Sequence, residues 1–207
     1  MQDIKNIMVR PLESTRYIKP ISVHYILNGK SRISHIVTSS HCVAVIIYNI
    51  SKNELVFVKQ FRASRYFSNI AKNDRCGQID PKKYSPDLGV ALELCAGIVD
   101  KEASLEQIAA EEILEECGYK VNVSHLEKIH SFPASEYTTI ISHIYYCEVT
   151  EAMKINEGGG IGDELIEVIN IPVTQVQEML FKENSLIHPN LMYCIYWFLK
   201  NKCELPE

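Results

Sequence analysis

Residues 96–119 read AGIVDKEASLEQIAAEEILEECGY, and this stretch is organised as a loop, a helix and a terminator. Ser104 is a favourable N-cap, and Gln107 three residues later completes a capping box. Gly118 is a natural end for the helix, since glycine readily adopts the left-handed conformation found there. Apolar residues recur at helical spacing between these ends, namely Leu105, Ile108, Ala109, Ile113, Leu114 and Cys117. The stretch therefore predicts an amphipathic helix that packs on the core through one side.

The other side of this predicted helix is unusually acidic. Four carboxylates lie in its last turns: Glu111, Glu112, Glu115 and Glu116. The last three stand at i, i+3 and i+4, where like charges destabilise a helix by roughly 0.2–0.5 kcal/mol per pair. The helix dipole is also negative at this end. A bound divalent cation would explain the arrangement, and ligands that offer only oxygen favour Mg²⁺ or Mn²⁺. The alternative is a solvated acidic face, which is the usual fate of such runs.

The spacing of glycines and glutamates resembles the Nudix box, G-x5-E-x7-R-E-U-x-E-E-x-G-U, in which U is an aliphatic or bulky apolar residue. The matching residues fall on the pattern in register: Gly97, Glu112, Ile113, Glu115, Glu116, Gly118 and Tyr119. Two positions differ, because the first Glu of the pattern falls on Ala103 and the Arg falls on Glu111. In the family those two residues chiefly form a structural pair between loop and helix. Their joint replacement makes Glu111 a candidate for an extra metal ligand.

The composition limits the classes of protein to which the chain can belong. Its 207 residues are 46% hydrophobic and 23% charged, which suits one globular domain with a substantial core. A net charge of −5 gives no general attraction to nucleic acid or to an anionic membrane. No apolar run reaches the ~18 residues of a membrane span, and the first residues lack the apolar region of a secretory signal. The 7 cysteines form no CxxC motif, so we expect reduced thiols in a cytoplasmic protein.

Apolar patterns on either side of the acidic stretch predict the remaining elements. Residues 20–37 form two alternating segments separated by Asn28-Gly29, the strongest short signal for a hairpin. Further β-branched and aromatic runs predict strands, at residues 43–50, 55–61, 90–95, 126–132, 138–149 and 165–171. Residues 174–181 and 191–200 are expected to be helical, whereas the polar residues 63–88 are expected to form a long surface loop. The order of elements indicates an α+β sandwich.

Other stretches extend the resemblance to the Nudix branch that hydrolyses ADP-ribose and UDP-sugars, and within it to the animal UDP-sugar pyrophosphatases. They are residues 17–25 (YIKPISVHY), 56–62 (VFVKQFR), 93–100 (ELCAGIVD) and 158–172 (GGGIGDELIEVINIP). The resemblance implies a Nudix α/β/α sandwich with a mixed sheet at residues 40–207 and a small N-terminal antiparallel β-region at residues 1–39. In that branch the N-terminal region is exchanged between protomers, and each active site borrows residues from the partner. A homodimer is therefore implied.

The resemblance also implies a set of metal ligands. Glu112 and Glu116 are the expected ligands of Mg²⁺ or Mn²⁺, and Glu115 is expected to join the catalytic set as a shared or second ligand. In this branch the backbone carbonyl before the box glycine is a further ligand, and that residue is Ala96 here. The turn at Gly97 would let this carbonyl face the helix.

The catalytic base of the branch is an acidic residue in the loop before the late strand. That loop reads GGGIGDELIEV, where Glu164 is the first candidate and Asp163 the second. A carboxylate beside Mg²⁺ is ionised at neutral pH and could accept a proton from the attacking water. The alternative is that both side chains only solvate the turn. The glycines are expected to give this loop the freedom to close over substrate.

Three further residues are candidates for substrate binding. Arg62 ends an apolar strand and could bind phosphate through its forked guanidinium group, whereas the alternative is a surface pair with a nearby acid. Glu93 could contact the substrate or the metal shell, or it could simply point outward from its strand. Tyr17 could stack on the base, and packing in the core or an interface is the alternative.

These expectations converge on Mg²⁺-dependent hydrolysis of the pyrophosphate bond of a nucleoside diphosphate sugar. UDP-glucose, which would give UMP and glucose 1-phosphate, is the expected substrate. ADP-ribose, which would give AMP and ribose 5-phosphate, is the nearest alternative, since the sequence does not display the base pocket. A non-catalytic sensor of nucleotide sugars is a different class, motivated by Ala103 and Glu111 in the altered box. The presence of every carboxylate needed for metal argues against a sensor.

Overall fold

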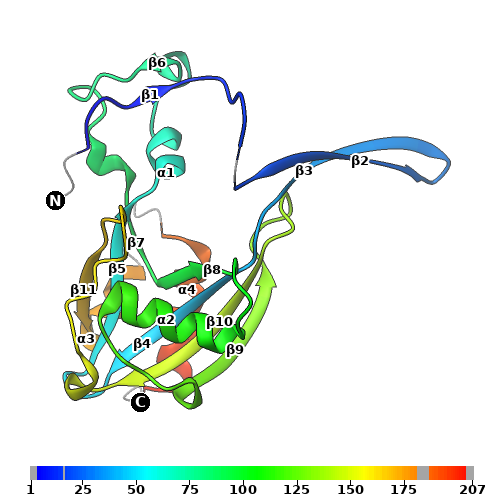
Figure 1. The fold of residues 1–207 in the computed structure, drawn as a ribbon. Coiled ribbons are helices and arrows are strands. Elements are labelled where there is room, and N and C mark those ends of the chain that lie inside the picture. The colour runs from blue at the N-terminus through cyan, green and yellow to red at the C-terminus, as the bar shows by residue number, and fades with distance from the viewer. Residues whose placement is uncertain (1–3, 16, 181–186, 204–207) are drawn as a thin grey trace.

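The computed structural model, which describes residues 4–15, 17–180 and 187–203, is built around a mixed sheet of 7 strands (Figure 1). The strands are β4 (Cys42–Asn49), β5 (Glu54–Phe61), β7 (Val90–Glu93), β8 (Cys95–Ile98), β9 (Leu126–Pro133), β10 (Ile141–Val149) and β11 (Glu167–Pro172). Their order is β11-β5-β4-β10-β9, with β7 beside β5 and β8 beside β4. Strands β4 and β10 are parallel, and the other pairs are antiparallel. The predicted α+β class with a mixed sheet is confirmed.

Both faces of the central sheet are covered, because successive side chains of a strand point to opposite sides. One set from β4 packs in the core that includes α2 (Leu105–Cys117): Val43, Val45 and Ile47. The other set packs in the core that includes α3 (Val173–Leu180) and α4 (Pro189–Asn201): Ala44 and Ile46. Figure 1 shows α2 in front of the sheet and α4 behind it. The result is the α/β/α sandwich that the resemblance implied.

A divergence between β4 and β5 places β8 beside α2. The two strands pair only near their hairpin, from Ile47↔Val56 to Asn49↔Glu54. Farther along, β5 pairs with β7 and β4 pairs with β8. The chain from β7 to β8 therefore occupies the opening between them and brings β8 into contact with α2.

Residues 63–88 do not form an irregular loop, so that expectation was wrong. They fold into four short elements: α1 (Ala63–Ser68), η1 (Lys72–Asp74), β6 (Gly77–Gln78) and η2 (Pro86–Gly89). Strand β6 pairs with β1 (Met8–Val9), and four buried side chains form a small separate core: Tyr66, Ile70, Ile79 and Tyr84. These residues are too sparse along the sequence to form a periodic pattern. Their cluster is completed by Ile7 and Val9, which lie far away in the chain.

The N-terminal hairpin consists of β2 (Lys19–Leu27) and β3 (Lys30–Thr38), which pair with each other along their whole length. At the base of the hairpin, Val37 also bridges to Thr138, in the segment before β10. Asn28 and Gly29 have φ values of 52° and 74°, as the predicted hairpin turn requires. Figure 1 shows the hairpin extending away from the sandwich as an arm, and every residue of β2 is exposed. Its exchange between protomers stays a prediction, as do the boundaries of the two predicted regions.

Two 3-10 turns complete the described elements, η3 (Val123–His125) and η4 (Glu151–Met153). None of the described helices has the length and apolar character that a bilayer crossing requires.

Candidate active site

Helix α2 begins and ends as its sequence predicts. The Ser104 hydroxyl accepts a hydrogen bond from the Gln107 amide at 3.1 Å, and the Gln107 side chain accepts one from the Ser104 amide at 2.8 Å. Gly118 ends the helix with a φ of 79°, and its amide donates to the Leu114 carbonyl at 3.1 Å. These local contacts hold the acidic residues in helical spacing.

Two carboxylates of α2 turn toward β8. A Cβ atom at Gly97 would collide with the carboxylate of Glu112, so the missing side chain lets that group lie against the strand. The Ala96 amide donates to Oε2 of Glu116 at 2.9 Å. In an extended strand the N–H and C=O groups of one residue point to the same edge, so the Ala96 carbonyl lies on the Glu116 side. Glu112, Glu116 and the backbone of Ala96, three of the expected metal ligands, are therefore gathered where α2 meets β8.

Burial of these carboxylates disfavours their charged form. It is the largest cause that raises the pKa of Glu112 to about 7, and neighbouring carboxylates, Glu164 among them, add to this effect. Burial also raises the pKa of Glu116, which is 4% exposed, to about 7. Hydrogen bonds from the Ala96 amide and the Cys95 thiol work in the opposite direction at Glu116. A divalent cation between the carboxylates would offset both the burial and the repulsion.

The donor set suits magnesium. Mg²⁺ is usually held by one or two carboxylates and completes its shell with waters and substrate phosphates. Glu112 and Glu116 supply the carboxylates, Ala96 supplies a carbonyl on the same side, and Glu115 is half-buried one residue before Glu116. Within the described residues, no three or more His, Cys, Asp or Glu side chains form a preformed metal cage. Two carboxylates and one carbonyl match the small number of protein ligands that Mg²⁺ commonly takes.

Arg62 and Glu93 bind each other at the ends of neighbouring strands. Nε of Arg62 lies 2.9 Å and 3.0 Å from the two carboxylate oxygens, and Nη2 lies 2.6 Å from Oε2. The Gln60 side-chain amide also donates to Glu93, at 3.0 Å. Burial alone would lower the pKa of Arg62, but the hydrogen bond to Glu93 and the charges of Glu93, Glu116 and Glu164 raise it. Arg62 therefore pairs with a nearby acid, as the alternative interpretation of this residue expected. It also interacts electrostatically with Glu116 of α2.

The glycine-rich loop brings Glu164 to the same cluster. Oε2 of Glu164 accepts a hydrogen bond from the Ile161 amide at 3.2 Å. The charge of Glu164 contributes to the raised pKa values of both Glu112 and Glu116. Asp163 and Glu164 are both exposed in this turn. Glu164 therefore interacts with the acidic residues of α2, and the choice of Glu164 or Asp163 as the base stays a prediction.

Two other residues singled out by sequence lie elsewhere. Glu111 forms an ion pair with Lys101 and keeps 49% of its side chain exposed, so it has a partner other than a metal. Tyr17 is 68% exposed and precedes β2 in the arm, where the Ser39 hydroxyl donates to its carbonyl at 2.8 Å. A contact between Tyr17 and a substrate base stays a prediction.

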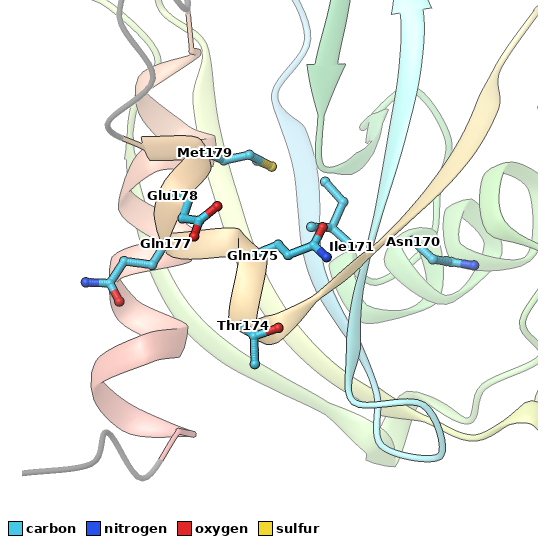
Figure 2. Close-up of a pocket in the computed structure, with 7 residues that line it drawn as sticks. All are labelled: Asn170, Ile171, Thr174, Gln175, Gln177, Glu178 and Met179. Carbon is cyan, nitrogen blue, oxygen red and sulfur yellow. The ribbon is translucent and has the colours of Figure 1, made fainter.

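A separate open hollow of about 850 Å³ lies between β11 and α3 (Figure 2). It is lined by Asn170, Ile171, Thr174, Gln175, Gln177, Glu178 and Met179. The lining contains none of the candidate site residues. This hollow is therefore separate from the acidic residues of α2.

Comparison with known proteins decides the family, although no family model matches the chain. Uridine diphosphate glucose pyrophosphatase NUDT14 from Bos taurus is 33% identical over 220 residues, covering 100% of this chain and 98% of that protein. The Mus musculus protein of the same name is 32% identical over 213 residues, covering 96% and 95%. The chain belongs to the Nudix family. The protein is therefore an enzyme of that family, and the two relatives that cover nearly its whole length are named as pyrophosphatases.

Two more distant matches agree with this assignment. A GDP-mannose pyrophosphatase from Cronobacter sakazakii is 31% identical over 136 residues, which cover 65% of this chain and 61% of that protein. The solved structure described as "Crystal structure of ADP compounds hydrolase" superposes with a TM-score of 0.63 over 99% of this chain and 98% of that one. Its sequence identity is 16%, so it shows a shared fold and nothing about substrate.

Sequence reasoning missed three contacts of the site. Gln60 gave no signal, because only the pairing of β5 with β7 places it beside Glu93. Cys95 belongs to no cysteine motif, so nothing in the sequence indicated that its side chain contacts Glu116. Lys101 did carry a signal: it is a cation in the loop where the family pattern expects one member of a loop–helix ion pair.

Proposed function

We propose that the protein hydrolyses the pyrophosphate bond of nucleoside diphosphate sugars in the presence of Mg²⁺, with UDP-glucose giving UMP and glucose 1-phosphate. The observation that carries this proposal is the gathering of half-buried Glu112 and buried Glu116 against Gly97 and the Ala96 amide of β8. The charge of Glu164 acts on both carboxylates, and the charge of Arg62 acts on Glu116. UDP-glucose is chosen because both relatives that cover nearly the whole chain are named for it.

Glu112 and Glu116 would hold Mg²⁺ or Mn²⁺, with Glu115 as a shared or second ligand and the Ala96 carbonyl as a further oxygen. A bound cation of this kind supplies positive charge against the diphosphate and lowers the pKa of water. The Ala96 amide keeps Glu116 oriented by its 2.9 Å hydrogen bond. Gly97 leaves the space that Glu112 occupies.

Glu164 acts as the base and Asp163 is the second candidate. A carboxylate oxygen of Glu164 accepts the proton of the water that attacks one phosphorus atom of the bridge. The bond between that phosphorus and the bridging oxygen breaks, and the other phosphate leaves with the bridging oxygen. The Ile161 amide holds Oε2 of Glu164 at 3.2 Å, which orients the carboxylate before substrate arrives.

Arg62 binds the diphosphate. Its Nε and Nη2 are directed at Glu93, which leaves Nη1 and the second N–H of Nη2 for phosphate oxygens. Glu93 fixes the plane of the guanidinium group, and Gln60 holds Glu93 in place by donating to its carboxylate. Glu93 therefore acts on the substrate through Arg62.

A second copy of this chain covers the N-terminal arm. An isolated two-stranded hairpin is at best marginally stable in water. One face of β2 exposes Ile21, Val23 and Tyr25, which are 42%, 40% and 43% exposed. A homodimer in which each arm packs on its partner would bury these apolar side chains and bring Tyr17 toward a substrate base.

The test is direct. The purified protein is incubated with MgCl₂ and, separately, UDP-glucose, ADP-ribose and GDP-mannose, and the products are identified by chromatography and ³¹P NMR. We expect the fastest turnover with UDP-glucose, yielding UMP and glucose 1-phosphate, and no turnover in EDTA. Faster cleavage of ADP-ribose would reassign the substrate. Binding of a nucleotide sugar without any cleavage would establish a non-catalytic sensor instead.

A further inference from the structure

Residues 156–164, the loop before β11, are docked on the C-terminal end of α2. The Gly159 amide donates to the Glu116 carbonyl at 2.9 Å, and the Gly160 amide donates to the Glu115 carbonyl at 3.0 Å. The last four carbonyls of a helix have no partner within the helix. The loop therefore caps the same helix that carries the candidate metal ligands.

Gly158 permits this close approach. Its φ is +69°, and a Cβ atom at this position would collide with the backbone carbonyl of Glu116. That carbonyl belongs to the last turn of a helix and has little freedom to move aside. Any side chain at position 158 would therefore push the loop away from the helix. The expected role of the glycines as a source of freedom is not what this geometry indicates.

The far end of the same loop carries Glu164. The Ile166 amide donates to the Gly159 carbonyl at 3.2 Å, and the Glu164 amide donates to the Ile161 carbonyl at 3.1 Å. A Cβ atom at Gly160 would lie 2.7 Å from Cβ and 2.9 Å from Oε2 of Glu164. The loop is closed on itself, so the position of Glu164 follows that of the docked glycines.

We propose that Gly158 is a positioning residue, which acts by letting the loop dock on α2 and thereby holds Glu164 at the acidic C-terminal end of that helix. This inference rests on the proposed function, because it concerns the base of that reaction. One helix then supports both the metal ligands and the base. A shared rigid support keeps reacting groups in their productive geometry.

Two matched substitutions test the proposal. Gly162 has a φ of +60°, close to that of Gly158, but nothing lies within 4 Å of a Cβ atom placed there. G158A and G162A therefore carry similar backbone strain, and only G158A collides with the helix. We expect G158A to lower kcat for UDP-glucose about tenfold or more. A correctly positioned base contributes roughly 10²–10⁴-fold to the rate, and G158A should remove part of that contribution. KM and the Mg²⁺ concentration for half-maximal rate should stay near wild type, and G162A should retain the wild-type kcat.

Two more measurements separate positioning from general damage. In an E164Q background, G158A should cause no additional loss of kcat, because its effect acts through Glu164. Hydrogen exchange at the amides of Gly159 and Gly160 should be slow in the wild type and in G162A, and fast in G158A. This second readout does not depend on activity.

The inference is overturned if G158A keeps the wild-type kcat, or if it lowers kcat equally with and without Glu164. Free exchange at Gly159 and Gly160 in the wild type would also overturn it. A wild-type protein that cleaves none of the nucleotide sugars would instead overturn the proposed function, and the exchange data would then show separately whether the loop docks.

Discussion

Lys101 and Glu111 form an ion pair that joins the loop after β8 to α2. The Glu111 carboxylate raises the pKa of Lys101 through this contact. The family pattern expects an acidic residue in the loop, at Ala103, and an Arg on the helix, at Glu111. In this protein the tie between loop and helix is kept with its charges reversed, because the cation lies in the loop and the anion on the helix.

Reversing these charges one at a time and together tests whether the Lys101–Glu111 ion pair stabilises the fold. K101E adds a carboxylate close to Glu111, Glu112 and Glu115, and E111K places two lysines together. We expect each single variant to lower the free energy of unfolding by about 0.5–1 kcal/mol, as for an exposed ion pair, and K101E/E111K to recover most of that loss. Urea unfolding at low salt measures the effect. A double variant as unstable as the two single losses combined would show that the pair contributes nothing.

Glu116→Gln should abolish turnover while the fold is retained, because it removes a buried charge at nearly constant volume. We expect kcat to fall more than about a hundredfold. Loss of a residue that only supports a metal ligand lowers activity roughly 10–100-fold, and loss of a ligand itself should lower it further. The same change at Glu111 should leave kcat near wild type, since Glu111 faces Lys101. Circular dichroism confirms the fold in both variants. Equal and severe losses at both positions would mean that the wrong side of α2 has been assigned to the metal.

Stability without metal should fall as the pH rises. The pKa values of Glu112 and Glu116 are raised to about 7 in the folded protein, above the ordinary value of 4.5. A raised acid pKa means that the folded state holds the proton more tightly. This contribution to stability is complete when the pH is below the pKa of the carboxyl groups in the unfolded state. It is lost as the pH rises through their pKa in the folded state.

The thermal midpoint in EDTA should therefore decrease between about pH 5 and pH 8. Mg²⁺ binds the ionised carboxylates, so its stabilising effect should be small near the acidic end and large near the alkaline end. Thermal unfolding with and without MgCl₂ measures both trends. Glu116→Gln should flatten the EDTA profile, and a profile unchanged by that substitution would contradict the assignment of the shift.

Charge on the arm should break the proposed dimer. Ile21 and Ser22 are adjacent in β2 and lie on opposite faces of the hairpin. Ile21→Asp should convert a dimer to a monomer, because it would bury an unpaired charge in the interface. Ser22→Asp adds the same charge on the other face and should be tolerated. Light scattering after size-exclusion chromatography gives the mass, and a monomeric wild type would rule out the dimer.

Residues within a few positions of each other determined a large part of this protein. The limits of α2 follow from Ser104, Gln107 and Gly118, whose capping contacts are local. The hairpin at Asn28-Gly29 follows from a turn that needs positive φ at both residues. Buried strands such as β4 follow from continuous apolar runs, because both faces of that strand are covered. The spacing of the acidic residues likewise comes from the helix itself.

The tertiary structure alone decided which of these groups meet. Glu93 lies beside Arg62 because β5 pairs with β7, and Glu111 meets Lys101 because the loop after β8 passes that side of α2. Residues 63–88 fold because side chains near the N-terminus complete their small core. Gly158 docks on α2 through a contact between segments far apart in the chain. Capping and turn preferences act over a few bonds and can be read from neighbouring residues. Contacts across the sheet depend on how whole elements pack, which no single stretch of sequence specifies.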